Sequence, residues 1–189
     1  LAKYKPNGYM TYMMFLMGFW PHSVGGRKIS DLAVDLHESF VHVFYKVLEP
    51  SYRALANSVG ILDAIKNSGA FKAGTPGADT IPEILALGNR ITYVTGKVGF
   101  NAFANTELDR VLRERNIKHV LVGGMVTSLC IDSTGRAAYE RGYSVTILSD
   151  CCSARTPAEQ AFFCQTVFPL YAGVLESKQA LAKLTAAAA

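Results

Sequence analysis

Short apolar runs alternate with segments of helical periodicity along most of the chain. The runs are typical of buried strands, and they lie at residues 31–35, 91–95, 120–122, 144–148 and 173–175. Strands of a parallel sheet that is covered on both faces show such near-continuous apolar runs. Their alternation with helices predicts the α/β class, with three layers, α/β/α, around a central and mostly parallel sheet.

The predicted helices are recognised by apolar residues that recur every three or four positions. They lie at residues 52–66, 81–87, 106–115, 128–141 and 158–166. The first has its apolar face at Leu55, Val59, Leu62 and Ile65. Glycine commonly follows the last turn of a helix, so we expect Gly69 to end this helix and Gly142 to end the fourth. The Gly123-Gly124 pair is expected to break the strand at 120–122.

The chain is predicted to form a single domain over residues 1–189, with residues 1–28 as an unassigned extension. A 189-residue chain with 50% hydrophobic residues can bury one sizeable core. The apolar stretch at residues 9–20 is too short to cross a bilayer, which takes about 20 residues. We therefore expect this stretch to pack in the core or at a subunit interface, and we expect no membrane partner.

Charge and cysteine content exclude several classes of protein. The net charge of +4 comes from scattered lysines and arginines rather than a basic stripe, which argues against nucleic-acid binding. The cysteines are at positions 130, 151, 152 and 164, a spacing that fits neither a disulfide framework nor a zinc ribbon. We expect free thiols in the cytoplasm, no metal or other cofactor, a small-molecule substrate and a homo-oligomer.

Side chains that could act in catalysis lie at one edge of the predicted sheet. Ligands of open parallel sheets bind beyond the carboxyl ends of the strands. Those ends carry Asp35, Lys97, the turn at residues 123–130 and Asp150. We assign Asp150 a structural role in a cap or turn. An acid, a base and a thiol from separate parts of the chain therefore converge on one place.

Cys130 is the most informative of these residues. It lies in the first turn of a predicted helix, where unpaired backbone amides favour an anion and the thiol pKa is expected to fall. A thiolate there suits nucleophilic catalysis. Each candidate also has a structural alternative: Cys130 as a small buried residue, Lys97 as an exposed lysine and Asp35 as a helix N-cap.

Three segments resemble motifs of the isochorismatase-like cysteine hydrolases, a family that includes nicotinamidases, N-carbamoylsarcosine amidohydrolases and isochorismatases. Residues 120–150 resemble the nucleophile motif, with the sequence VLVGGMVTSLCIDSTGRAAYERGYSVTILSD. Residues 97–103, KVGFNAF, resemble the lysine motif, and residues 33–40, AVDLHESF, resemble the first strand. The resemblance implies the three-layer fold and a hydrolase that acts on small molecules.

The resemblance also implies a mechanism. Asp35 would accept the thiol proton, Lys97 would stabilise the thiolate, and Cys130 would attack a carbonyl to give a thioacyl-enzyme. The backbone amides of Val126 and Cys130 would form the oxyanion hole, behind a non-proline cis peptide bond between Met125 and Val126.

The substrate pocket is the least defined part. Phe40, Phe100 and Phe103 are candidates for its walls, with core packing as the alternative for each. His37 replaces the usual glutamine of the family, which is expected to alter substrate contacts. No second strand is recognised between residues 66 and 91, where nicotinamidases bind a metal. The chain is shortened there, or lacks residues, or uses residues 9–19 as a substitute.

The function expected from these features is hydrolysis of an amide or carbamoyl C–N bond through a thioacyl-enzyme. Three alternatives remain open: hydrolysis of an isochorismate-type vinyl ether, a metal-containing amidase similar to nicotinamidase, and a non-catalytic member of the fold.

Overall fold

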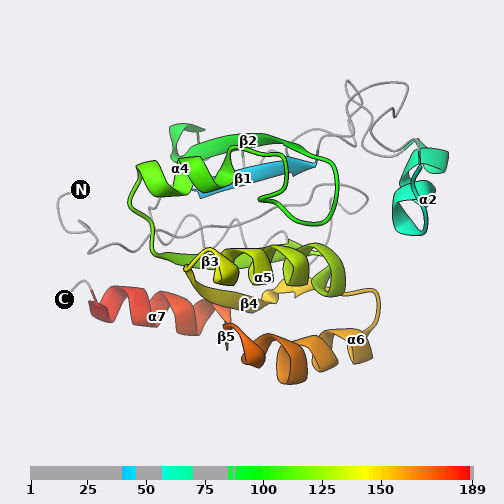
Figure 1. The fold of residues 1–189 in the computed structure, drawn as a ribbon. Coiled ribbons are helices and arrows are strands. Elements are labelled where there is room, and N and C mark those ends of the chain that lie inside the picture. Colours follow the sequence, from blue (N-terminus) through cyan, green and yellow to red (C-terminus); the bar gives the residue numbers. More distant parts are fainter. Residues whose placement is uncertain (1–39, 46–56, 70–84, 87, 188–189) are drawn as a thin grey trace.

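The computed structural model describes residues 40–45, 57–69, 85–86 and 88–187 of the chain (Figure 1). The predicted strand at 31–35, the extension at 1–28 and the candidates Asp35 and His37 lie outside the described residues.

All the strand pairs in the described part are parallel. β1 (Phe40–Tyr45) pairs with β2 (Ile91–Lys97), and Tyr45 lies opposite Lys97. β4 (Ser144–Ser153) lies between β3 (His119–Met125) and β5 (Gly173–Leu175). This arrangement confirms the predicted α/β class with a parallel sheet.

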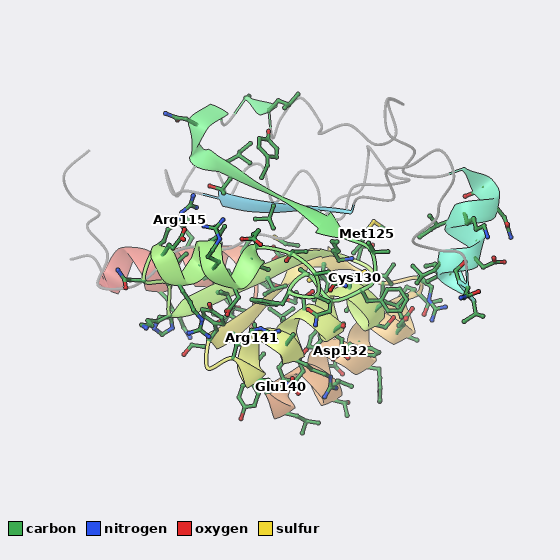
Figure 2. All side chains as sticks on the ribbon, turned by 45° about the horizontal axis from the view of Figure 1, so that its top comes forward. Arg115, Met125, Cys130, Asp132, Glu140 and Arg141 are labelled. Carbon is green, nitrogen blue, oxygen red and sulfur yellow. The ribbon has the colours of Figure 1, made fainter. Side chains whose placement is uncertain are left out.

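The helices of the described part are α2 (Ile61–Ser68), α4 (Leu108–Glu114), α5 (Asp132–Glu140), α6 (Pro157–Phe162) and α7 (Ser177–Ala187). α2 lies apart from the strands, at the right of Figure 1. α4 and α5 lie together in front of the strands in Figure 1, and α7 lies behind α4 in Figure 2. None of the helices in the described residues is long and apolar enough to cross a bilayer.

The core lies between the strands and the helices on them. Leu108 and Leu112, four residues apart on α4, are completely buried, as the apolar periodicity predicts. Val120 and Val122 of β3 and Ile147 of β4 join the same core cluster. Val94 of β2 also belongs to this cluster, so the core packs against both of the strands whose carboxyl ends form the site.

The continuous helix predicted at residues 52–66 is wrong over residues 57–60, which are not helical, and residues 52–56 lie outside the described part. α2 begins only at Ile61, because Gly60 has a φ of 62°, a conformation that cannot continue a right-handed helix. Val59 is 83% exposed and does not belong to a buried face. Gly69 ends the helix as predicted, with a φ of 68° and its amide bonded to the Lys66 carbonyl at 3.2 Å.

Two strands extend further than predicted. β3 does not break at Gly123-Gly124 but continues to Met125, with a register shift between Val122 and Gly124. Gly124 permits this irregularity because its φ is 132°. β4 continues to Ser153, which places Asp150 inside the strand rather than near its end.

Asp150 has the capping role that the structural interpretation expects. Its carboxylate accepts hydrogen bonds from the Ser177 amide at 2.8 Å and the Ser177 hydroxyl at 2.7 Å. Ser177 is the first residue of α7, a helix that the apolar pattern did not predict. Asp150 thereby satisfies a backbone donor at the start of α7 and carries a negative charge there.

Candidate active site

The candidate nucleophile is presented by a turn that follows β3. The Met125–Val126 peptide bond is cis, as the resemblance implies, and η4 (Thr127–Ile131) follows it. The Val126 carbonyl accepts hydrogen bonds from the amides of Leu129 at 3.1 Å and Ile131 at 3.3 Å. The second bond spans five residues and makes this a π turn, so the helix predicted from residue 128 becomes α-helical only at Asp132.

Lys97 and Cys130 come together at the carboxyl ends of β2 and β3. Lys97 is the last residue of β2, and its side chain is completely buried. Its Nζ atom lies 3.7 Å from Cys130 Sγ and also donates a hydrogen bond to the Gly99 carbonyl. Figure 2 shows Cys130 beside Met125 near the tip of the β2 arrow, whereas Glu140 and Arg141 lie at the far end of α5.

The electrostatics of this pair are dominated by burial. Burial lowers the pKa of Lys97 to about 8, and the neighbouring Cys130 thiolate only partly offsets that effect. Burial raises the pKa of Cys130, against the opposing influence of the Lys97 charge and of a hydrogen bond from the Val126 amide. The expectation that the Cys130 pKa falls is therefore wrong in its direction, because the side chain is only 7% exposed.

The two groups nevertheless stabilise each other's charged form. A cation beside a thiol favours the thiolate, and a thiolate beside an amine favours the ammonium. Lys97 is thus placed to hold a negative charge that develops on the Cys130 sulfur, and the Val126 backbone also opposes the rise in the Cys130 pKa.

The aromatic candidates differ in placement. Phe103 packs in the core, with its ring 6.0 Å from that of Tyr143 and the Arg141 guanidinium 4.8 Å from its centroid, which supports core packing for this residue. Phe100 is partly buried against the same core, as is Met125. Phe40 is the first residue of β1.

Polar side chains that the sequence pattern did not single out support the nucleophile turn. The Thr127 hydroxyl, in a fully buried side chain, donates to Gln160 Oε1 at 2.6 Å. Gln160 Nε2 in turn donates to the Ser149 carbonyl at 3.0 Å. The next residue of the turn, Ser128, donates to Glu159. Two adjacent side chains of α6 thus hold the turn.

Thr134 is another buried residue with a hydroxyl that the sequence pattern did not single out. It interrupts the apolar face of α5, and a polar residue in that setting needs a hydrogen-bonding partner. That mismatch is the sequence signal that could have found it. Within the described residues, no group of three or more histidine, cysteine, aspartate or glutamate side chains is arranged to hold a metal ion.

Comparison with known proteins gives the family. The family model of the isochorismatase domain matches residues 26–179, which include both Lys97 and Cys130. The chain belongs to the isochorismatase family. Members of this family are hydrolases, and relatives named for a specific activity include amidases and an amidohydrolase.

Two curated relatives illustrate the range of similarity. The isochorismatase family protein YddQ of Bacillus subtilis is 27% identical over 141 residues, 66% of this chain and 77% of that protein. The ureidoacrylate amidohydrolase RutB of Caulobacter vibrioides is 36% identical over 61 residues, 32% of this chain and 27% of that protein.

Solved structures share the fold over most of the chain. An isochorismatase family protein of Burkholderia thailandensis is 25% identical with a TM-score of 0.71, covering 95% of this chain and 97% of that one. A nicotinamidase of Bacillus subtilis has a TM-score of 0.66 at 18% identity, covering 89% of this chain and 100% of that one. For an N-carbamoylsarcosine amidase of Thermoplasma acidophilum the values are 0.63 and 20%, with coverage of 89% and 97%.

Proposed function

We propose that this protein hydrolyses an amide or carbamoyl C–N bond of a small molecule, with Cys130 as the nucleophile. The observation that carries the proposal is the buried Lys97 amine 3.7 Å from Cys130 Sγ, at the carboxyl ends of two strands. A buried lysine beside a buried thiol is costly for folding alone, and such pairs concentrate at sites where charge is used.

The reaction has two halves. The Cys130 thiol gives its proton to a base, and its sulfur forms a bond to the substrate carbonyl carbon. The C–N bond then breaks, the amine leaves with that proton, and a thioester remains on Cys130. Water attacks the thioester, the acid is released, and the thiol regains its proton. The family resemblance assigns the base role to Asp35, which lies outside the described residues.

Each described residue has a defined task in this scheme. The Lys97 ammonium stabilises the thiolate that develops before attack, which partly offsets the effect of burial on the Cys130 pKa. The Val126 amide, which is directed toward the sulfur, is placed to bind the carbonyl oxygen once the C–S bond forms. The turn η4 holds Val126 and Cys130 together through the hydrogen bonds to the Val126 carbonyl.

Relatives support the C–N class of substrate. Nicotinamidase, N-carbamoylsarcosine amidase and ureidoacrylate amidohydrolase are each named for cleavage at a C–N bond. We infer that this chain accepts a compound of the same general kind, a small amide, ureido or carbamoyl compound. Such a substrate fits the expected small-molecule partner.

Release of ammonia from a panel of small primary amides, N-carbamoyl compounds and ureido acids tests the proposal. We expect at least one compound to be hydrolysed, and we expect Cys130→Ala to abolish the activity. Cys164→Ser is the matched control, because it removes a partly buried thiol outside the site and keeps an acceptor for the hydrogen bond from Gln160. Full activity of Cys130→Ala on these compounds, or hydrolysis of isochorismate alone, would refute the proposal.

A further inference from the structure

A single buried hydroxyl connects the helix that follows Cys130 with the loop that follows Lys97. Thr134 lies in α5, four residues after Cys130, and is completely buried. Its Oγ1 atom accepts a hydrogen bond from the Ala102 amide at 3.0 Å and donates one to the Phe100 carbonyl at 3.4 Å. Both partners belong to the loop at residues 98–103, which we call the lysine loop.

The lysine loop in turn holds the amine of Lys97. The Lys97 Nζ atom donates to the carbonyl of Gly99, in the same loop. A continuous path of contacts therefore runs from Thr134 through the loop backbone and Gly99 to the amine, which lies 3.7 Å from Cys130 Sγ. The path therefore starts and ends in one continuous segment, because the turn η4 that contains Cys130 leads directly into α5.

The hydroxyl cannot be replaced by another partner at that position. Ala102 is completely buried, so its amide has no access to water if the hydroxyl is removed. A buried donor without an acceptor is unfavourable, and the backbone moves to satisfy it. Such a movement would shift the Gly99 carbonyl and, with it, the Lys97 amine.

We propose that Thr134 is a positioning residue, which docks the lysine loop on α5 and thereby sets the distance between the Lys97 amine and the Cys130 sulfur. This inference rests on the proposed function, because it gives Thr134 a role through that pair. Thr134 touches neither reacting group in this arrangement and acts only through the loop.

The test measures how fast iodoacetamide alkylates Cys130 at a series of pH values, with peptide mapping to identify the labelled thiol. The readout is the midpoint of this pH profile. The midpoint reports thiol ionisation separately from access, which changes only the plateau rate. Thr134→Val is nearly isosteric but removes the hydroxyl. We expect it to raise the midpoint by about one pH unit, so that at pH values below the midpoint the thiolate fraction falls about tenfold. Thr134→Ser keeps the hydroxyl and is expected to restore the wild-type midpoint.

Two control variants make the result specific. Tyr143→Phe also removes one hydroxyl from a buried side chain, whose partner is Asp109, and should leave the midpoint unchanged. Lys97→Met should raise the midpoint at least as much as Thr134→Val. If Thr134→Val does not fold, as judged by near-UV circular dichroism, Thr134→Ala replaces it in the comparison with the serine variant.

Three results would overturn the inference. Thr134→Val could keep the wild-type midpoint, Thr134→Ser could fail to restore it, or Tyr143→Phe could shift it as much as Thr134→Val. If Lys97→Met shifts the midpoint and Thr134→Val does not, only the role of Thr134 fails. If Lys97→Met has no effect, the electrostatic part of the proposed function fails as well.

Discussion

At the scale of single residues, the four thiols of the chain differ in their surroundings. Burial raises the pKa of Cys152 well above its ordinary range and also raises that of Cys164. Cys130 is subject to the same effect but has the Lys97 amine 3.7 Å away, which favours its thiolate. The neighbouring Lys97 amine therefore distinguishes Cys130 from Cys152 and Cys164, although burial raises the pKa of all three thiols.

We predict that limited iodoacetamide treatment near pH 8 labels Cys130 before the other thiols. Lys97→Met should remove this preference, because it leaves the burial of Cys130 without the compensating charge. Peptide mapping by mass spectrometry gives the order of labelling. First labelling of Cys164, with activity retained, would count against Cys130 as the nucleophile.

Tyr143 provides a second prediction at this scale. Burial and a hydrogen bond to Asp109, 2.8 Å long, raise the pKa of Tyr143 to about 12. The folded state thus favours the neutral phenol. This contribution to stability is fully present below the ordinary pKa near 10 and is lost as the pH rises toward 12.

Urea unfolding at pH 9 and pH 11.5 measures this effect. The wild type should lose more free energy of unfolding between the two pH values than Tyr143→Phe, by on the order of 2 kcal/mol. Equal losses in the two proteins would show that the phenol is not protected from ionisation.

At the scale of elements, α5 depends on a glycine for its close approach to Tyr171. A Cβ atom at Gly135 would lie 2.9 Å from the Tyr171 hydroxyl and 3.0 Å from a ring carbon. The ring cannot move freely, because its hydroxyl bonds the Asp132 carboxylate at 3.2 Å and its edge packs against Phe168. Alanine is therefore expected to overfill this contact.

Gly135→Ala should lower the free energy of unfolding by up to about 2 kcal/mol. Overpacking typically costs about 1–3 kcal/mol, which outweighs the gain of about 1 kcal/mol from the higher helix propensity of alanine. Chemical denaturation gives the difference. In the Tyr171→Ala background the same substitution should be neutral or stabilising, and destabilisation of equal size there would place its cause elsewhere.

The apolar pattern predicts some helices and strands correctly and misses features that depend on backbone conformation. Residues 106–115 and 173–175 are predicted correctly in type; Leu108 and Leu112 are buried, whereas Val174 and Leu175 are only partly buried. The prediction of one continuous helix at residues 52–66 fails over residues 57–60, because periodicity does not register the backbone conformation of Gly60. The π turn was missed since it depends on a hydrogen bond to Val126, not on the pattern.

Part of the site could be predicted and part could not. The convergence of Lys97 and Cys130 followed from the placement of both at the carboxyl ends of strands. The pKa of Cys130 was predicted to fall, because the position at a helix start was visible while the depth of burial was not. Thr134 and Gln160 were not identified, because their role lies in contacts more than 30 residues away in sequence or across elements.

At the scale of the whole molecule, the thiol of Cys130 is the sole nucleophile of the proposed reaction. We predict that hydrolysis persists after exhaustive treatment with a chelator, since neither half of the proposed reaction needs a metal-bound water. The measurement is the rate on the best substrate of the panel before and after dialysis against EDTA. Loss of activity that zinc or iron restores would favour a nicotinamidase-like, metal-containing amidase instead.

The covalent intermediate is the most direct test of the central claim, that Cys130 attacks the substrate carbonyl. Turnover on the best substrate, quenched in acid within the first cycles and followed by intact mass and peptide mapping, reports any acyl group on the protein. The account predicts a mass increase equal to the acyl part of the substrate, confined to the peptide that contains Cys130 and absent from Cys130→Ala. Rapid hydrolysis with no adduct on that peptide, at unchanged rate in Cys130→Ala, would contradict it.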